Sequence, residues 1–314
     1  MLNSAPPRFM ASAAGAYLAA PPLSPEDLTM VLLVRQDKDS ADTPMPTVTV
    51  GEIPGVVREL AAVGIHSVKI FAGARRRDRL ASGALKKDSL MVRAIGAAKE
   101  PLGSATTVLT ETCLCGYTDS GNCYVTNGSG MIAERRSVEA IAAQAAVQAA
   151  AGADIVGPAA MLPGCTEAVR SALDEDGHGG VGIMPHLIFS SSLYQGFRST
   201  MHAEPRDGRP HQISPFQPSA ALASALQMTR EGADVVLLEP ALASADLVPA
   251  LTGAGIKVAP FSVSGEYLSL TRVQADGTRD CTALVEVYQM LKRSGAVRII
   301  TYAARDIARV LHRC

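Results

Sequence analysis

The amino-acid sequence predicts an α/β fold of the (β/α)8 barrel (TIM barrel) type, on three observations. Short apolar runs bounded by turn residues recur along the whole chain, and stretches with helical spacing lie between most of them. Several of these stretches end in a glycine just before the next apolar run. A helix closed by glycine and followed at once by a continuous apolar strand is typical of a parallel sheet covered by helices.

The elements follow one another in the order that a barrel needs. A Pro-rich N-terminal arm is expected over residues 1–26 and a TIM-barrel catalytic domain over residues 27–314. The predicted strands are residues 31–34, 67–71, 106–109, 154–156, 181–188, 234–238, 257–263 and 298–301. The predicted helices include residues 56–62, 89–99, 138–151, 167–173, 219–231 and 281–292. Eight such units in 314 residues with 47% hydrophobic content favour one large domain, and two smaller domains are the alternative.

The composition of the chain limits which kinds of molecule the protein is expected to bind and in which compartment it is expected to occur. The net charge is -1 and charged residues make up 19% of the chain, so no broad basic field is available for nucleic acid or an acidic membrane surface. No segment is long and apolar enough to span a membrane, and the weakly apolar residues 9–20 are assigned to the arm rather than to a signal peptide. Six cysteines, three of them clustered, favour a metal site in a reducing compartment, so a cytoplasmic location is expected.

Three cysteines stand within eleven residues, directly after the third predicted strand: Cys113, Cys115 and Cys123. Thiolates are soft ligands that suit zinc, and three protein ligands leave the fourth tetrahedral position open, as in a catalytic metal site. Active sites of TIM barrels lie at the carboxyl ends of the strands, where this stretch is expected. The alternative is a group of reduced cysteines that only pack in the core. The prediction is a Zn2+ site.

Together with these cysteines, seven further motifs give the chain its resemblance to a known family. They are AGADIVGP (151–158), LDE (173–175), YQGFR (194–198), EGAD (231–234), PAL (240–242), VSGEY (263–267) and TY (301–302). From about Pro25 to Ala303 the chain resembles porphobilinogen synthase, also called 5-aminolevulinate dehydratase. The resemblance implies a barrel that condenses two molecules of 5-aminolevulinate, with two Schiff-base lysines near the ends of the fifth and sixth strands and a three-cysteine zinc.

Both lysine positions of the family carry other residues in this chain. The window 184–194 reads MPHLIFSSSLY and contains no lysine, and the position before the PAL motif is Glu239. Neither Phe189 in that window nor a carboxylate can form an imine with a carbonyl. We therefore expect that the family's two-lysine route is absent.

Other candidate residues have two readings each. Glu239 is a candidate catalytic general base or a counter-charge for a substrate ammonium, and the alternative is a structural ion pair with an arginine. Tyr194 is a candidate proton donor or a core residue. His186 is expected to be a packing residue more often than a catalytic one. Lys69 could replace a lost amine if it pointed into the barrel, but a solvent-facing strand end is the favoured expectation because lysine is seldom fully buried.

The resemblance also implies a set of substrate-binding residues. Ser264 and Tyr302 match the family residues that hold one substrate carboxylate through their hydroxyl groups. Arg198, Arg209 and Gln212 lie in or beside a lid loop that binds the second carboxylate, with a solvated loop as the alternative for Arg209. The planar fork of arginine suits a carboxylate.

These observations lead to one leading hypothesis and two alternatives. The leading hypothesis is a zinc-dependent lyase or cyclodehydratase that condenses a small amino or keto carboxylate without lysine Schiff bases, in specialised biosynthesis. The alternatives are authentic porphobilinogen synthesis by a compensating route, and a non-catalytic zinc-bearing homologue that binds a metabolite or assembles with a true synthase. The expected partners are a small-molecule carboxylate substrate and further copies of the chain, in a homo-oligomer from dimer up to octamer.

Overall fold

The computed structural model describes residues 21–36, 43–205 and 208–312. Its main sheet has nine parallel strands in the order β5-β4-β3-β2-β1-β11-β8-β7-β6. The strands are β1 (Leu28–Val34), β2 (Ser67–Ala72), β3 (Thr107–Thr110), β4 (Ile155–Val156), β5 (Gly182–Ile183), β6 (His186–Ile188), β7 (Val236–Glu239), β8 (Val258–Ser262) and β11 (Ile299–Thr301). A separate exposed hairpin is formed by β9 (Arg272–Val273) and β10 (Arg279–Asp280).

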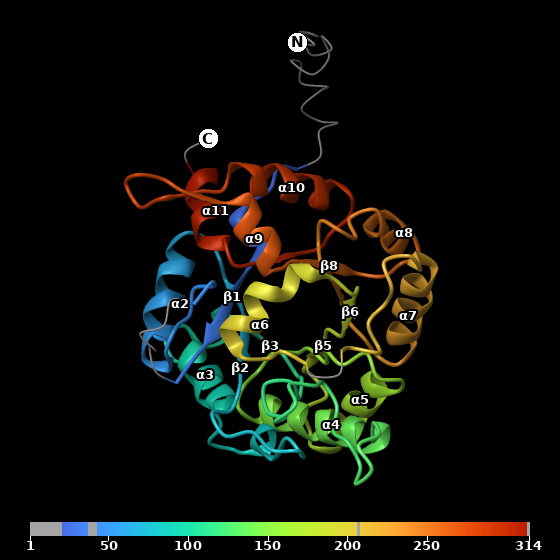
Figure 1. The fold of residues 1–314 in the computed structure, drawn as a ribbon. Coiled ribbons are helices and arrows are strands. Elements are labelled where there is room, and N and C mark those ends of the chain that lie inside the picture. The colour runs from blue at the N-terminus through green and yellow to red at the C-terminus, as the bar shows by residue number, and fades with distance from the viewer. Residues whose placement is uncertain (1–20, 37–42, 206–207, 313–314) are drawn as a thin grey trace.

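Ten helices are found in the described part of the chain, and most of them surround the sheet (Figure 1). They are α2 (Ile53–Ala62), α3 (Leu90–Lys99), α4 (Glu134–Ala150), α5 (Cys165–Glu175), α6 (Gln195–Met201), α7 (Pro218–Arg230), α8 (Leu247–Gly253), α9 (Ser264–Leu270), α10 (Thr282–Arg293) and α11 (Ala304–Leu311). All eight predicted strands and all six predicted helices correspond to observed elements.

The sheet closes through the fifth predicted strand, which the structure divides into β5 and β6. Only Met184 and Pro185 separate these two pieces, which stand at opposite ends of the strand order. The Met184 amide donates to the carbonyl of Val156, the last residue of β4 (2.9 Å), and the Leu237 amide of β7 donates to the Pro185 carbonyl (3.0 Å). The segment therefore contacts both neighbours, and the ring has eight strand positions, which confirms the TIM-barrel prediction.

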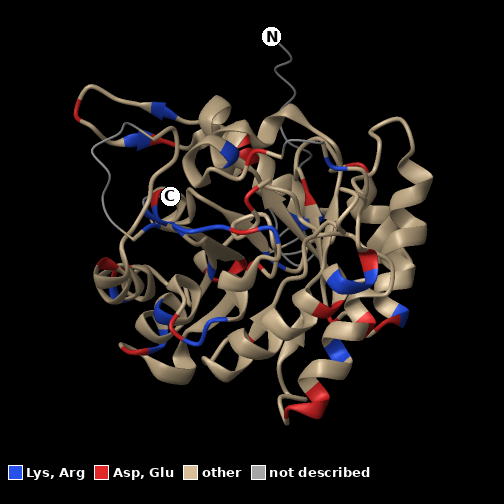
Figure 2. Ribbon diagram, turned by 60° about the horizontal axis from the view of Figure 1, so that its bottom comes forward, with Lys and Arg blue, Asp and Glu red and all other residues tan. Residues whose placement is uncertain are grey.

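The apolar runs of the sequence are continuous because the strands are buried on both faces. All residues of β7 and β8 are buried, and so are all residues of β1 except Met30. Their outer faces pack on helices and their inner faces fill the barrel, as expected for parallel strands covered by helices. On the outer surface, Lys and Arg are interspersed with Asp and Glu (Figure 2).

One short helix, α6, lies over the barrel opening inside the ring of outer helices (Figure 1). It packs against α9, and the contact depends on glycine, because a methyl group on Gly265 would lie 2.7 Å from the Leu193 carbonyl. The Ser264 hydroxyl connects the two elements: it accepts a hydrogen bond from the Phe197 amide and donates one to the Leu193 carbonyl, each at 3.0 Å. Thus α6 and α9 together form one wall of the barrel mouth.

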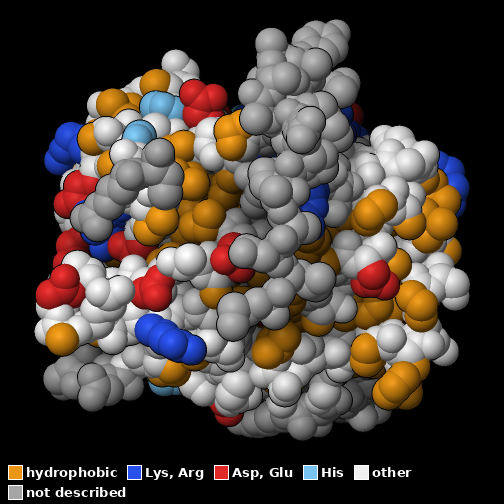
Figure 3. Space-filling model, turned by 90° about the horizontal axis from the view of Figure 1, so that it is seen from above, with side chains coloured by type: hydrophobic (Ala, Val, Ile, Leu, Met, Phe, Trp, Pro, Cys, Tyr) orange, Lys and Arg blue, Asp and Glu red, His pale blue; other side chains and the backbone are white. Residues whose placement is uncertain are grey.

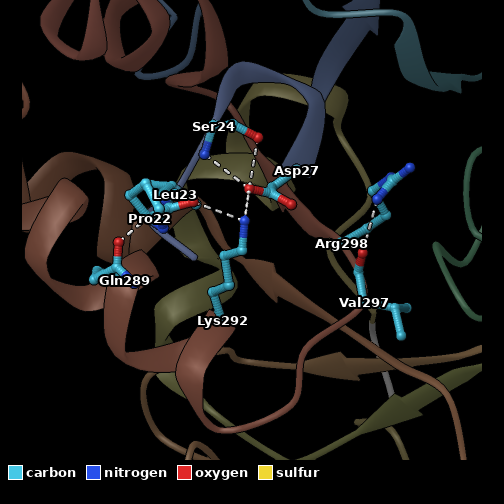
Figure 4. Close-up of polar contacts among 8 residues, drawn as sticks. All are labelled: Pro22, Leu23, Ser24, Asp27, Gln289, Lys292, Val297 and Arg298. Carbon is cyan, nitrogen blue, oxygen red and sulfur yellow. Dashed lines mark hydrogen bonds and ion pairs between the residues drawn. The ribbon is translucent and has the colours of Figure 1, made fainter. Parts of the chain in front are cut away.

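The chain enters the barrel along α10 (Figure 4). Lys292 donates to the Pro22 carbonyl at 2.8 Å and pairs with the Asp27 carboxylate, and the Leu23 amide donates to Gln289 Oε1 at 2.7 Å. The last residues of the predicted arm are thus attached to α10. Residues 1–20 of that arm lie outside the described residues, so the boundary between arm and barrel domain stays a prediction.

None of the helices in the described ranges is both long enough and apolar enough to cross a membrane.

Candidate active site

A pocket of about 500 Å³, part of it open to solvent, lies at the carboxyl ends of the barrel strands. It receives side chains from β2, from the loop after β3, from β6, β7 and β8, and from the loop after β11. Its lining contains every residue predicted for the site: Cys113, Cys115, Cys123, Tyr194, Arg198, Arg209, Gln212, Glu239, Ser264 and Tyr302. The barrel therefore brings together residues that are up to 189 positions apart, from Cys113 to Tyr302.

Aromatic rings form the apolar side of the pocket. The ring centre of Phe71 lies 5.4 Å from that of Phe197 and 5.8 Å from that of Phe261. Phe261 is in turn 5.8 Å from Tyr302. Such a wall limits the access of water and lowers the local dielectric constant, so that the charges on the opposite side interact strongly.

The three cysteines converge through a tight turn after β3. The Leu114 carbonyl accepts the amides of Tyr117 and Thr118 at 2.8 and 2.9 Å, and Gln144 of α4 donates to the Cys113 carbonyl at 3.3 Å. The three sulfur atoms lie within 4.8 Å of one another. Cys113 and Cys115 are buried, and Cys123 is half-buried.

The donor set and its electrostatics fit a metal ion. Three soft sulfur ligands at this separation can coordinate a single tetrahedral ion such as zinc and leave one position free. Hydrogen bonds from Cys113 and Cys115 lower the pKa of Cys123 well below its usual value, so one thiolate is already favoured without a metal. Hydrogen bonding within the cluster and burial raise the pKa of Cys113. These residues form a cluster that can hold a metal ion.

Arg209 connects the loop after α6 to this cluster. Its guanidinium donates to the sulfur of Cys123 and to the Ala203 carbonyl, the latter at 3.0 Å. Burial opposes its charge, but the Cys123 and Cys115 thiolates more than offset burial and raise the pKa of Arg209. The solvated-loop alternative for Arg209 is therefore wrong, because its side chain lies in the pocket against the sulfur cluster.

Glu239 ends β7 in the pocket floor, and its partner is His186 of β6 rather than an arginine. Glu239 Oε1 lies 2.9 Å from His186 Nδ1, and both side chains are almost fully buried. Burial raises the pKa of Glu239 to about 8, although Lys69, Arg209 and Arg198 act in the opposite direction. Burial lowers the pKa of His186 well below its usual value, and Lys69 adds to this effect. The pair can therefore accept or release a proton inside the pocket.

Lys69 lies inside the barrel, and the expectation that it faces solvent at a strand end is wrong. Its side chain is fully buried, and its Nζ donates to the Thr110 carbonyl at 3.0 Å. The amine lies 5.5 Å from the centre of the Phe71 ring, which lines the pocket. Burial lowers the pKa of Lys69 to about 8, against the opposing charges of Glu111 and Glu239.

Phe189, in the window where the resemblance implies the first lysine, and Glu239, at the implied position of the second, are neighbours in space. Phe189 follows β6 and Glu239 ends β7, and the Phe189 amide donates to the Glu239 carbonyl at 2.9 Å. The Tyr194 hydroxyl donates to the Phe189 carbonyl at 3.0 Å, and burial raises the Tyr194 pKa well above its usual value. Tyr194 is therefore held as a protonated phenol whose hydrogen atom is engaged with the backbone.

The predicted carboxylate-binding residues differ in how accessible their polar groups are to a substrate in the pocket. Arg198 lines the pocket with its guanidinium carbon 5.3 Å above the Tyr194 ring, and Gln212 lines the pocket beside it. Tyr302 is buried in the aromatic wall with a raised pKa caused by burial. Ser264 lines the pocket too, but its only hydroxyl proton is donated to the Leu193 carbonyl. Their binding roles stay predictions.

Barrel enzymes carry out their chemistry in a pocket at the carboxyl ends of the strands, and this molecule is accordingly an enzyme of the TIM-barrel class. A family model described as delta-aminolevulinic acid dehydratase matches residues 10–310 of the chain. The chain therefore belongs to the delta-aminolevulinic acid dehydratase family, whose members are lyases, and the resemblance drawn from the motifs is confirmed.

Individual relatives match over nearly the whole chain. The delta-aminolevulinic acid dehydratase of Halalkalibacterium halodurans is 33% identical over 287 residues, covering 89% of this chain and 86% of the relative. That of Mycobacterium leprae is 31% identical over 303 residues, covering 91% and 90%. The solved structure of the Toxoplasma gondii ME49 enzyme, in complex with the reaction product porphobilinogen, superimposes with a TM-score of 0.88 at 25% identity, covering 98% and 92%.

Several residues of the pocket region are not assigned to it from the sequence, and His186 and Lys69 are the two that bear on proton transfer. A signal existed in the period-two spacing of the strands, because Lys69 and Phe71 share one face of β2, and His186 and Ile188 share one face of β6. General frequencies for histidine and lysine outweighed that spacing.

Replacement of Cys113 by serine is expected to abolish stoichiometric metal binding, because a hydroxyl is a poor substitute for a thiolate ligand. The metal-to-protein ratio of the purified variant, measured by plasma mass spectrometry, checks this. Cys165→Ala is the matched control, since Cys165 is also buried but lies at the start of α5, outside the cluster. Equal metal content in wild type and Cys113→Ser would contradict the assignment.

Replacement of Glu239 by glutamine is expected to stabilise the protein increasingly as the pH rises from 4.5 to about 8. In this window folded Glu239 keeps its proton while the unfolded chain releases it, so the wild type loses up to about 1.4 kcal/mol of unfolding free energy per pH unit relative to the variant. Urea unfolding at several pH values measures the difference. The matched control is Glu286→Gln, at an exposed position within α10 and outside the pocket. A difference that does not change with pH would refute the raised pKa.

Proposed function

We propose that this protein is a zinc-dependent lyase or cyclodehydratase that condenses a small amino or keto carboxylate without lysine Schiff bases. The observation that carries the proposal is the replacement of both amine positions beside an intact thiol cluster. Phe189 and Glu239 stand at the ends of neighbouring strands, directly hydrogen-bonded through their backbones, and neither offers a nucleophilic amine. A role in specialised biosynthesis is part of the proposal.

Zinc is the proposed cofactor because the three sulfur atoms are soft, close together and partly ionised. When bound, it would act as a Lewis acid on a carbonyl or amine at its open position. Arg209 would remain beside Cys123 and offset part of the negative charge of the thiolates. The side-chain amide of Gln144 would hold the backbone of Cys113 in place by donating a hydrogen bond to the Cys113 carbonyl.

The proposed substrate is a small carboxylate. Arg198 and Gln212 offer donors on the side of α6, and the fork of Arg198 suits a carboxylate. Tyr302 offers a hydroxyl on the opposite wall. Ser264 could donate to a carboxylate only after its hydroxyl rotates away from the Leu193 carbonyl.

Proton transfer is assigned to Glu239 with His186. A carboxyl whose pKa is about 8 lies close to the pH at which a general acid or base is most effective. A substrate ammonium could also be held at this carboxylate. The phenol of Tyr194 has the weaker case for catalysis, because its proton is engaged with the Phe189 carbonyl.

A second candidate function is authentic porphobilinogen synthesis by a compensating route. The match to named dehydratases over most of the chain favours it, and so does the buried amine of Lys69. It differs from the first proposal in requiring that 5-aminolevulinate is converted to porphobilinogen.

Trapping with borohydride in the presence of 5-aminolevulinate is expected to leave the mass of the protein unchanged, with no porphobilinogen formed. Positions 189 and 239 carry no amine, and the Lys69 amine is bonded to the Thr110 carbonyl below the pocket. Intact-mass analysis and a colorimetric porphobilinogen assay measure both outcomes, with metal content determined on the same sample. Glu239→Lys is a positive control, since it returns an amine to the strand end. A reduced adduct on Lys69 or porphobilinogen formation would instead support the second candidate.

A homo-oligomer in the cytoplasm is also proposed. Several large apolar side chains are exposed, including Phe216 at 91%, Met131 at 65% and Val273 at 64%. Apolar side chains also reach the surface at several points of the face that carries α10 and α11 (Figure 3). Contact with further copies would remove such surface from water. Sedimentation velocity is expected to give a mass of at least twice 32.7 kDa, and a monomer at all concentrations would contradict this.

A further inference from the structure

Beneath the pocket, Lys69 and His186 lie on either side of one bare stretch of backbone. A methyl group placed on Gly157, just after β4, would lie 2.8 Å from Lys69 Nζ and 3.2 Å from His186 Nε2. It would also lie 2.6 Å from the Thr110 carbonyl, which accepts the hydrogen bond of Lys69. The absence of a side chain at Gly157 therefore leaves the space in which the amine and the imidazole edge face each other.

The two nitrogen atoms of His186 have different surroundings. Nδ1 lies 2.9 Å from Glu239 Oε1, whereas Nε2 is buried and has no hydrogen-bond partner among the residues that the structure describes. Nε2 is the nitrogen on the side of Gly157 and Lys69. Lys69 in turn has one direct hydrogen-bond acceptor among the described residues, the neutral Thr110 carbonyl. Burial lowers its pKa, and Glu111 and Glu239 act at longer range in the opposite direction.

An ammonium group next to a neutral imidazole favours one tautomer. If the proton were on Nε2, the N–H dipole would point its positive end toward the Lys69 cation, and Nδ1 would have to accept a hydrogen bond from a protonated Glu239. If the proton is on Nδ1, the lone pair of Nε2 faces the cation and Nδ1 donates to Glu239 Oε1. The second arrangement satisfies both neighbours, whether or not Glu239 is ionised, because Oε1 can accept in either form.

We propose that Lys69 is a positioning residue that fixes His186 as the Nδ1–H tautomer, so that Glu239 Oε1 is held as an acceptor and Oε2 is left to act on the substrate. The amine thus acts through the imidazole on a pocket residue without itself contacting substrate, in agreement with its absence from the pocket lining. The inference deepens the proposed function, since it rests on Glu239 being the proton-transferring group.

The test is nitrogen NMR of the resting protein labelled with 15N-histidine, in which long-range correlations identify the protonated nitrogen of each ring. The His186 signals are assigned by their loss in His186→Asn. In the wild type, Nδ1 of His186 is expected to give a pyrrole-type resonance and Nε2 a pyridine-type one. In Lys69→Met, which keeps an unbranched side chain only one atom shorter but removes the charge, Nε2–H is expected to appear.

The matched control is Lys99→Met, which removes the lysine of the Lys99–Asp154 ion pair at β3 and β4 without touching the pocket. It is expected to lower stability while leaving the His186 resonances as in the wild type. A wild-type His186 with its proton on Nε2 would overturn the proposal without any variant, and so would an unchanged tautomer in Lys69→Met. Because no substrate is present, a failure of the proposed lyase activity would not alter these readings.

Discussion

The balance of buried charges in the barrel interior is the constraint on which the rest of the pocket depends. An unpaired charge in a dry protein interior costs several kcal/mol, and removing one member of a buried pair leaves that cost uncompensated. The groups that can carry charge in and beneath this pocket are Lys69 and Arg209 on the positive side and Glu111, Glu239 and Cys123 on the negative side, and burial raises the pKa of both glutamates. The electrostatics of each group are therefore set by the others, and none of them can be changed independently.

The barrel makes this balance of charges possible because its strands bring residues that are distant in the sequence close together in its interior. Lys69 comes from β2, the thiols follow β3, and His186 and Glu239 lie on the adjacent strands β6 and β7. Glycines at close approaches complete the arrangement: Gly157 leaves room for the amine, and Gly265 lets α9 lie against the Leu193 backbone. The wall that α6 and α9 form at the mouth then reduces the contact of these groups with bulk water, which strengthens their interactions.

The fold was predictable because each of its signals is local. Apolar runs buried on both faces, helical spacing and closing glycines each act within a few residues, so all eight strands were found, with boundaries close to those observed. The thiol cluster was found for the same reason, since its three ligands stand within eleven residues. Predictions that depended on one side chain meeting a distant partner were less successful. The partner of Glu239 is His186 and not an arginine, and Lys69 faces inward rather than outward.

The wrong expectation for Lys69 shows that the general rarity of buried lysines takes no account of the charged groups around one particular lysine. Lysine is seldom buried because its charge needs compensation, and that compensation is invisible until β3, β6 and β7 are placed around β2. Once these strands are placed, the need of a buried lysine for charge compensation can be applied to Lys69 itself. Lys69 is fully buried with a carbonyl as its direct partner, and the nearby carboxyl groups of Glu111 and Glu239 counteract part of the effect of burial on its pKa. The pocket is then divided by chemistry, with soft ligands for an electrophilic metal on the side of β3 and groups that move or hold a proton on the side of β6 and β7. Under the proposed function, a substrate bound between them would meet an acid–base pair at the strand end where the resemblance implies an amine. The buried Glu239–His186 pair beside the thiol cluster is the observation that favours the proposal of a changed mechanism over decay of the site.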